Sequence, residues 1–258
     1  MLLHQRLPFL RSLVPPEPSW RGTGAIRLTR DWRDRSLLAL PHVAAQLAAG
    51  VPESDTGLLA KIGSPLYNQN GLEACVAYST CAVASLDLVR QGLAWGLFDA
   101  AALYAENGGD GREGVDPRRV LKDVVENGFP RSTGLRARLV DAYAFAPQVP
   151  GAFRQALKAA LAAGQPCVVA MLLPSPFGYE SGMTPTAAYH QVCAVAYEPE
   201  WLWVLNSWGD DWPEPGAPGL GRVKWDFLEG HELQAGYCYA YTTTAAAAVI
   251  SPPVLPPP

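Results

Sequence analysis

Along this 258-residue chain, segments with helical character come first and segments with strand character follow. The helical segments are apolar or amphipathic, and most are bounded by capping or helix-breaking residues. They are Ser36–Ala49, Cys75–Arg90, Phe98–Glu106, Asp116–Asn127 and Ala152–Ala163. The strand segments, rich in β-branched and aromatic residues, are Cys167–Leu173, Gln191–Tyr197, Leu202–Leu205, Gly221–Trp225 and Tyr237–Tyr241. Helices segregated from strands predict an α+β fold, in which two lobes flank a cleft.

Residues with strong positional preferences mark the start of two helical segments. Asp116 is suited to cap the segment that it begins, and Pro117 fits the first helical position. In Ser36–Ala49, Pro41 favours a helix that starts later than Ser36.

The two ends of the chain differ from its middle. Residues 1–55 are predicted to form an N-terminal extension, in which Leu7–Pro18 contains four prolines and is not expected to be regular. Residues 244–258 form an Ala/Pro-rich tail, and five of the last eight residues are proline. Such a tail is expected to be extended or disordered, and it is a candidate for contact with a partner.

Composition excludes several classes of protein. Hydrophobic residues make up 49% of the chain and charged residues 17%, which is typical of a globular protein. The formal net charge is −4 and no Lys/Arg run occurs, so neither nucleic acid nor a membrane is an expected partner. Apolar windows such as Cys167–Leu173 are too short to span a bilayer.

The start of the chain does not resemble a signal peptide. Arg6 and Arg11 interrupt it, and no apolar stretch of the required length follows. We therefore expect a cytoplasmic protein, although export by a signal-independent route stays open.

Cysteine usage also indicates a reducing compartment. The five cysteines are an odd number at low density, and Cys81, Cys167, Cys193 and Cys238 lie in apolar runs. This pattern predicts buried thiols and no disulfides. No CxxC pair occurs, and His190 and Cys193 would face opposite sides of one strand, so no metal site is expected. No phosphate loop or dinucleotide motif indicates a cofactor.

A polar, Gly-containing loop runs directly into the longest apolar helix. The loop is Tyr67-Asn-Gln-Asn-Gly-Leu-Glu-Ala, and Cys75 follows it as the first residue of Cys75–Arg90. The amino end of a helix carries partial positive charge and free N–H groups, which favour thiolate over thiol. Cys75 is therefore a candidate nucleophile. An ordinary buried cysteine is the alternative that this stretch alone leaves open.

His190 and Asn206 flank a predicted hairpin. Its strands, Gln191–Tyr197 and Leu202–Leu205, are joined by a short Pro-containing turn. Antiparallel pairing would bring together His190 at the start of the first strand and Asn206 at the end of the second. The amide oxygen would then hold the imidazole in one tautomer and orientation. Trp208, two residues further on, would screen that hydrogen bond from water.

Taken together, these residues resemble the papain-like cysteine peptidases, and the bacterial branch of that family fits best. The family has a Gln six positions before Cys-Trp-Ala-Phe-Ser, and here Gln69 lies six positions before Cys75-Val-Ala-Tyr-Ser. Asn206-Ser-Trp-Gly repeats a second family motif letter for letter. The sixteen-residue spacing from His190 to Asn206 and the order Cys, His, Asn also match. Asp31-Trp-Arg resembles a motif near the start of mature family domains, although it lies unusually far from the cysteine.

The resemblance implies a papain-like two-lobe fold over residues 56–243. The helical lobe would cover about 56–145, and the β-rich, barrel-like lobe about 146–243.

The resemblance also implies a role for each motif residue. Cys75 would be the nucleophile, paired as a thiolate with the imidazolium of His190, which Asn206 would orient. Gln69 and the main-chain N–H of Cys75 would donate to the oxyanion. Trp208 would shield the hydrogen bond between His and Asn.

A Gly-rich segment supplies the candidate substrate-binding residues, together with Trp208. Gly108, Gly109 and Gly114 fall where the family has a Gly-rich strip that pairs with an extended peptide. A simple surface turn over Asn107–Gly114 fits these residues equally well.

The sequence departs from the family pattern at three positions near the nucleophile. Val76 replaces the usual Trp, and Glu73 stands where a small residue is common. Leu72 occupies the position of a family half-disulfide, which agrees with a reducing compartment.

The sequence therefore predicts a cysteine peptidase that acts on a peptide or protein substrate through a thioester on Cys75, without a cofactor. An amidase or acyltransferase would pass the same thioester to an amine instead of water. A non-catalytic papain-like binding module is the alternative from another class, in which Glu73 and Val76 mark a repurposed cleft.

Overall fold

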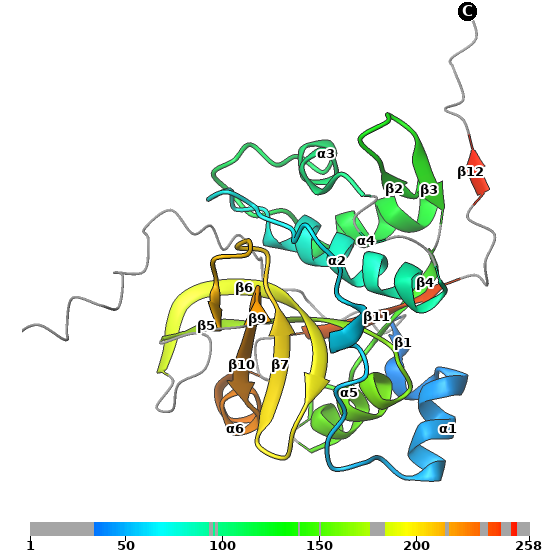
Figure 1. Cartoon of the computed structure of the whole chain (residues 1–258), viewed down its shortest axis with the longest axis vertical. Helices are drawn as coiled ribbons and strands as arrows, with labels where there is room; N and C mark the ends of the chain where they lie inside the picture. The colour runs from blue at the N-terminus through cyan, green and yellow to red at the C-terminus, as the bar shows by residue number, and fades with distance from the viewer. Residues whose placement is uncertain are drawn as a thin grey trace, which may run out of the picture.

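The computed structural model describes residues 34–92, 95, 98–138, 140–149, 151–175, 184–214, 217–232, 237–243 and 249–251. Their elements form a helical lobe and a β-rich lobe (Figure 1). The Pro-rich segment Leu7–Pro18, the motif at 31–33 and the tail residues 244–248 and 252–258 lie outside the described residues.

The helical lobe is built around α2, which is buried over most of its length. Its elements are α2 (Cys75–Arg90), α3 (Ala100–Glu106), α4 (Pro117–Glu126) and the short strands β2 (Phe129–Pro130), β3 (Arg136–Arg138) and β12 (Val249–Ser251). α2 contains no Gly or Pro, and it packs against α3 as well as against the other lobe. A helix packed on several sides needs apolar residues around its circumference, as this one has. None of the described helices is long and apolar enough to cross a membrane.

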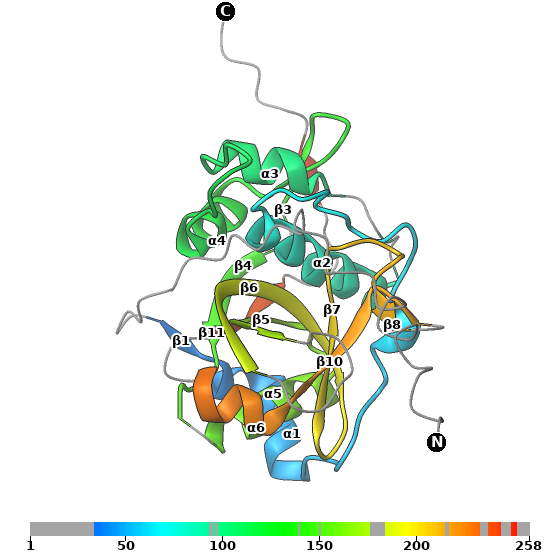
Figure 2. The same ribbon diagram turned by 90° about the vertical axis from the view of Figure 1, so that its left-hand side faces the viewer.

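One seven-stranded sheet organises the β-rich lobe, with the strand order β1-β4-β11-β5-β6-β7-β10. In that order the strands are Arg35–Ser36, Val140–Phe145, Tyr237–Thr243, Cys167–Ser175, Thr184–Tyr197, Trp201–Leu205 and Leu220–Lys224. β1 is parallel to β4, and the other neighbours are antiparallel. The helices of this lobe are α1 (Pro41–Ala49), α5 (Ala152–Ala162) and α6 (Trp225–Phe227), which lie at the end of the molecule away from α3 and α4 (Figure 2). The short elements are β8 (Pro213–Glu214), β9 (Ala217–Pro218), η2 (Leu37–Ala39), η3 (Leu59–Lys61) and η4 (Leu228–Glu232).

The described part of the predicted N-terminal extension packs on the β-rich lobe. α1 contacts α5, and β1 pairs with β4. Asp55 exchanges two main-chain hydrogen bonds of 2.9 Å with Tyr197 at the end of β6.

Helix starts agree with the sequence in most cases. α2 has the predicted bounds, and Asp116 caps α4 by accepting a hydrogen bond of 2.9 Å from the main-chain N–H of Arg118. The segment Ser36–Ala49 is α-helical only from Pro41, which confirms the later start that Pro41 indicates. Pro41 occupies the first helical turn, and Arg35–Ser36 instead pairs as a strand.

Two expectations about the strands are wrong. Helices and strands are not fully segregated, since β4 precedes α5 in the chain. His190 does not start β6, which begins at Thr184 opposite Ser175 of β5. The six residues before His190 include Pro185 and have a weak strand pattern, but β5 offers them a pairing partner.

The cysteines agree with the sequence. All five are buried, and none takes part in a disulfide. The prediction of buried thiols is therefore confirmed.

Candidate active site

The loop before α2 brings Cys75 to the boundary between the lobes. Asn70 and Gly71 have φ angles of +48° and +79°, and Asn68 Oδ1 accepts a hydrogen bond of 2.9 Å from the main-chain N–H of Asn70. These left-handed residues turn the chain into α2, of which Cys75 is the first residue. The Cys75 side chain is fully buried.

The structure brings His190 and Asn206 into contact. β7 ends at Leu205 opposite Cys193, and the chain leaves the sheet there toward His190. His190 Nε2 lies 2.7 Å from Asn206 Oδ1, and the main-chain N–H of Ser207 donates to the same oxygen at 2.8 Å. Because this oxygen only accepts, Nε2 carries a hydrogen. In the neutral ring Nδ1 is then the nitrogen that can take up a proton.

An indole covers the imidazole ring. The ring centroids of Trp208 and His190 lie 4.8 Å apart with an interplanar angle of 27°, and Trp212 packs edge-on against Trp208 at 5.3 Å. Trp208 is itself buried, so this stack keeps water from one face of the imidazole. Gly209 follows with a φ of +81°, and a Cβ there would meet Asn68 Nδ2 at 2.5 Å, which explains the glycine.

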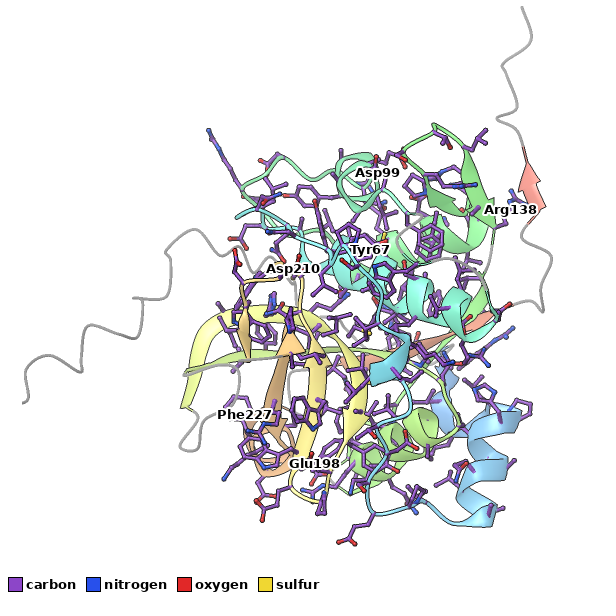
Figure 3. All side chains as sticks on the ribbon, in the orientation of Figure 1. Tyr67, Asp99, Arg138, Glu198, Asp210 and Phe227 are labelled. Carbon is purple, nitrogen blue, oxygen red and sulfur yellow. The ribbon has the colours of Figure 1, made fainter. Side chains whose placement is uncertain are left out.

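The turn after β7 also contacts the loop before α2. The main-chain N–H of Gly209 donates to the Tyr67 carbonyl at 3.3 Å, and Asn68 and Trp208 form a β-bridge. Figure 3 shows Tyr67 and Asp210 near the level where the lobes meet.

Gln69 is fully buried and is joined to the Asn206 turn. Its Oε1 accepts a hydrogen bond of 2.6 Å from Ser207 Oγ, and its main-chain N–H donates to the Ser207 carbonyl at 2.9 Å. Its Nε2 donates to the Leu72 carbonyl at 2.5 Å. An amide nitrogen carries two hydrogens, and this contact uses one of them. Gln69, Ser207, Asn206 and His190 thus form one hydrogen-bonded chain, which we call the His–Gln chain.

The ionisation of Cys75 differs from the expectation. Burial raises the pKa of the Cys75 thiol above its usual value. The main-chain N–H of Gln191 favours the thiolate and acts against this effect, whereas the Glu73 carboxylate raises the pKa further. The expected acidic thiol is therefore wrong for this structure, in which burial outweighs the main-chain N–H donors at the start of α2.

Neutralising Glu73 should make Cys75 more acidic. A carboxylate opposes thiolate formation, so Glu73→Gln is expected to lower the thiol pKa and to move the pH profile of Cys75 alkylation by iodoacetamide toward lower pH. Glu73 is half-buried, and we expect a rate gain of less than about tenfold at a fixed pH. The gain should shrink at high ionic strength, where the charge is screened.

The matched control is Glu126→Gln at the exposed end of α4, where Glu126 pairs with Lys122 at 3.8 Å. If Glu73→Gln does not change the pH profile of Cys75 alkylation, the Glu73 carboxylate does not influence the pKa of the thiol.

The candidate substrate-binding glycines lie on the loop after α3. Gly108 has a φ of +89° and is exposed, whereas Gly109 packs against the ring of Tyr104. Tyr104 OH accepts a hydrogen bond of 3.0 Å from the main-chain N–H of Gly111, which ties the loop to α3. The peptide-binding role of Gly108, Gly109 and Gly114 stays a prediction.

Sequence reasoning missed two residues that hold the site together. Ser207 links Gln69 to Asn206, and Gln191 contacts the first turns of α2. Ser207 lies inside the quoted Asn-Ser-Trp-Gly motif, where it received no role. Gln191 is a polar residue that directly precedes the apolar run Val192–Tyr197 in the same strand. A polar side chain beside a buried apolar run is the signal that could have indicated its role.

Neither protein-family models nor curated protein sequences match this chain. Xylellain, a cysteine protease from Xylella fastidiosa, superposes with a TM-score of 0.68 at 16% identity, over 87% of this chain and 97% of its own. The digestive procathepsin L2 proteinase of Tenebrio molitor gives a TM-score of 0.66 at 18% identity, over 92% and 82%. The procathepsin B S9 of Trypanosoma congolense gives 0.65 at 17% identity, over 88% of each chain. These similarities show the fold, which is the papain-like α+β fold of two lobes.

Proposed function

We propose that this protein is a cysteine peptidase that hydrolyses peptide bonds through a thioester on Cys75. The observation that carries the proposal is the His–Gln chain, which ends on the loop leading into Cys75. A nucleophile at a helix start, a base in a fixed tautomer and an amide donor are the groups that acyl transfer needs.

In the proposed first half-reaction, His190 Nδ1 takes the thiol proton while the Cys75 sulfur attacks the scissile carbonyl carbon. The resulting oxyanion accepts hydrogen bonds from the Gln69 amide and the main-chain N–H of Cys75. The imidazolium then protonates the leaving amine, the C–N bond breaks and a thioester remains. In the second half-reaction His190 deprotonates a water molecule, which attacks the thioester. The acid product leaves, and the sulfur regains its proton from the imidazolium.

The raised pKa of the thiol fits this order of events. Burial raises the pKa of Cys75 and so favours the thiol over the thiolate. Attack then depends on His190 as a base, and water or substrate that reaches Cys75 lowers the desolvation penalty.

Loss of the Gln69 amide should slow turnover without weakening substrate binding. Gln69→Ala removes one oxyanion donor, which costs on the order of 3 kcal/mol of transition-state stabilisation, or about 10²-fold in kcat. KM should change little. The measurement is a steady-state comparison with the parent on one fluorogenic peptide.

Ser207→Ala is the control for this change. It removes the hydroxyl that donates a hydrogen bond to Gln69 Oε1, and it leaves the side-chain N–H groups of Gln69 in place. It should lower kcat by only a few-fold. Equal losses in both variants would assign Gln69 a structural role and would contradict its place in the oxyanion hole.

The proposal is tested by digestion of an unfolded protein in ¹⁸O-labelled water. A peptidase releases fragments whose new carboxyl ends contain the heavy oxygen, and prior treatment with iodoacetamide abolishes their release. Fragments joined to an added amine in place of labelled oxygen would instead show acyl transfer. Binding of the unfolded protein without cleavage would favour a non-catalytic module.

A further inference from the structure

Gln191 follows His190 on β6 and is fully buried. Successive residues of a strand face opposite sides of the sheet. His190 accordingly contacts Asn206, whereas the Gln191 side chain reaches Val76 on α2. Neighbouring residues of one strand thus connect the proposed base to the helix that carries the proposed nucleophile.

The Gln191 amide forms a directional link to the main chain of Cys75. Its Nε2 lies 2.8 Å from Ser79 Oγ and 3.2 Å from the Val76 carbonyl. A carbonyl only accepts, so the NH₂ group must be the one that faces α2. Ser79 Oγ in turn donates to the Cys75 carbonyl at 2.6 Å. Hydrogen bonds therefore run from Gln191 through the Ser79 hydroxyl to Cys75.

A third element completes this buried network. Gln191 Nε2 also lies 3.1 Å from the hydroxyl of Tyr239 on β11, and that hydroxyl lies 3.2 Å from Thr80 Oγ1 on α2. Ser79, Thr80 and Tyr239 are all buried. Buried polar groups are costly unless they are paired, and a paired network fixes one arrangement of the elements that it joins. Here it fixes α2 against β6 and β11.

The main chain of Gln191 acts on the sulfur directly. Its N–H lies close enough to the Cys75 thiol to stabilise the thiolate. A shift of the first turn of α2 away from β6 would weaken this contact and would also move Cys75 away from the strand that carries His190.

We infer that Gln191 is a positioning residue, which holds the first turn of α2 and the Cys75 sulfur in register with His190. The inference rests on the proposed function and assigns Gln191 a part in it. Gln191 acts through Ser79 and the main chain of Cys75, and it does not touch the substrate.

The test replaces Gln191 by Met, which keeps the length of the side chain and removes both N–H donors. We expect kcat on a fluorogenic peptide to fall about tenfold with KM unchanged. The iodoacetamide profile of Cys75 should move to higher pH by roughly one unit, because the first turn of α2 is no longer held against the main-chain N–H of residue 191, which favours the thiolate. Ser79→Ala should act in the same direction, and the double variant should fall no further than Gln191→Met, since both break one chain.

Gln165→Met is the matched control. Gln165 is also buried, and its Nε2 donates to the Pro166 carbonyl at 3.2 Å, before β5 begins. It should lower the melting temperature without moving the alkylation profile. If Gln191→Met does not fold, Ser79→Ala decides the question, because it breaks the same chain with a smaller change.

Two outcomes separate the inference from the proposed function. A parent protein that neither cleaves peptides nor reacts at Cys75 overturns the proposed function and the inference with it. The inference alone is overturned if the parent protein is reactive but Gln191→Met or Ser79→Ala changes the alkylation profile and kcat no more than Gln165→Met does.

Discussion

Replacement of Cys75 by Ala is expected to abolish peptide hydrolysis, with kcat falling on the order of 10⁶-fold. The thioester cannot form without the sulfur, and the remaining groups only stabilise charge and bind substrate. The measurement is kcat on a fluorogenic peptide, with the purified variant assayed at high concentration so that the remaining activity can be detected. Substrate binding should survive, because the truncation removes no contact beyond the sulfur.

Cys81→Ala is the control for this prediction. Cys81 lies on the same helix and is also fully buried, but it belongs to the hydrophobic core. The variant should lose some stability and keep its turnover. Turnover that survives Cys75→Ala, or that disappears in Cys81→Ala with the fold intact, would place the nucleophile elsewhere.

Replacement of His190 by Ala should cause a loss of similar size. Burial raises the pKa of the Cys75 thiol, so attack requires the imidazole as a base. Because nucleophile and base act as one unit, the double variant Cys75→Ala/His190→Ala should be no slower than either single variant. His42→Ala, at an exposed position of α1, is the control and should leave kcat unchanged. Losses that add in the double variant would contradict a single catalytic unit.

The elements that position the site could largely be predicted from the sequence. α2 has its predicted bounds because sixteen residues without Gly or Pro follow a Gly-containing loop. The contact between His190 and Asn206 follows from antiparallel pairing of two strands with a short turn between them. Local pattern and hairpin topology are enough for both features.

Features that depend on tertiary packing could not be predicted. The start of β6 at Thr184 is set by its pairing with β5, since Pro185 and the small residues around it give no clear strand signal. The direction of the Cys75 pKa was also missed. A helix start favours the thiolate, but the sequence does not reveal how completely the side chain is removed from water, and here burial is the larger effect.

The central claim is that Cys75 and His190 act as a pair, and site-resolved alkylation tests it most directly. All five cysteines are buried, so burial alone gives no reason for one thiol to react first. The parent protein, His190→Ala and His42→Ala would be treated with iodoacetamide at neutral pH, and the rate at each cysteine followed by peptide mapping. The account predicts that Cys75 reacts before the other four in the parent and in His42→Ala, and that His190→Ala slows it by roughly a hundredfold. The account would be contradicted if Cys75 reacted no faster than Cys81, or if His190→Ala left the rate at Cys75 unchanged.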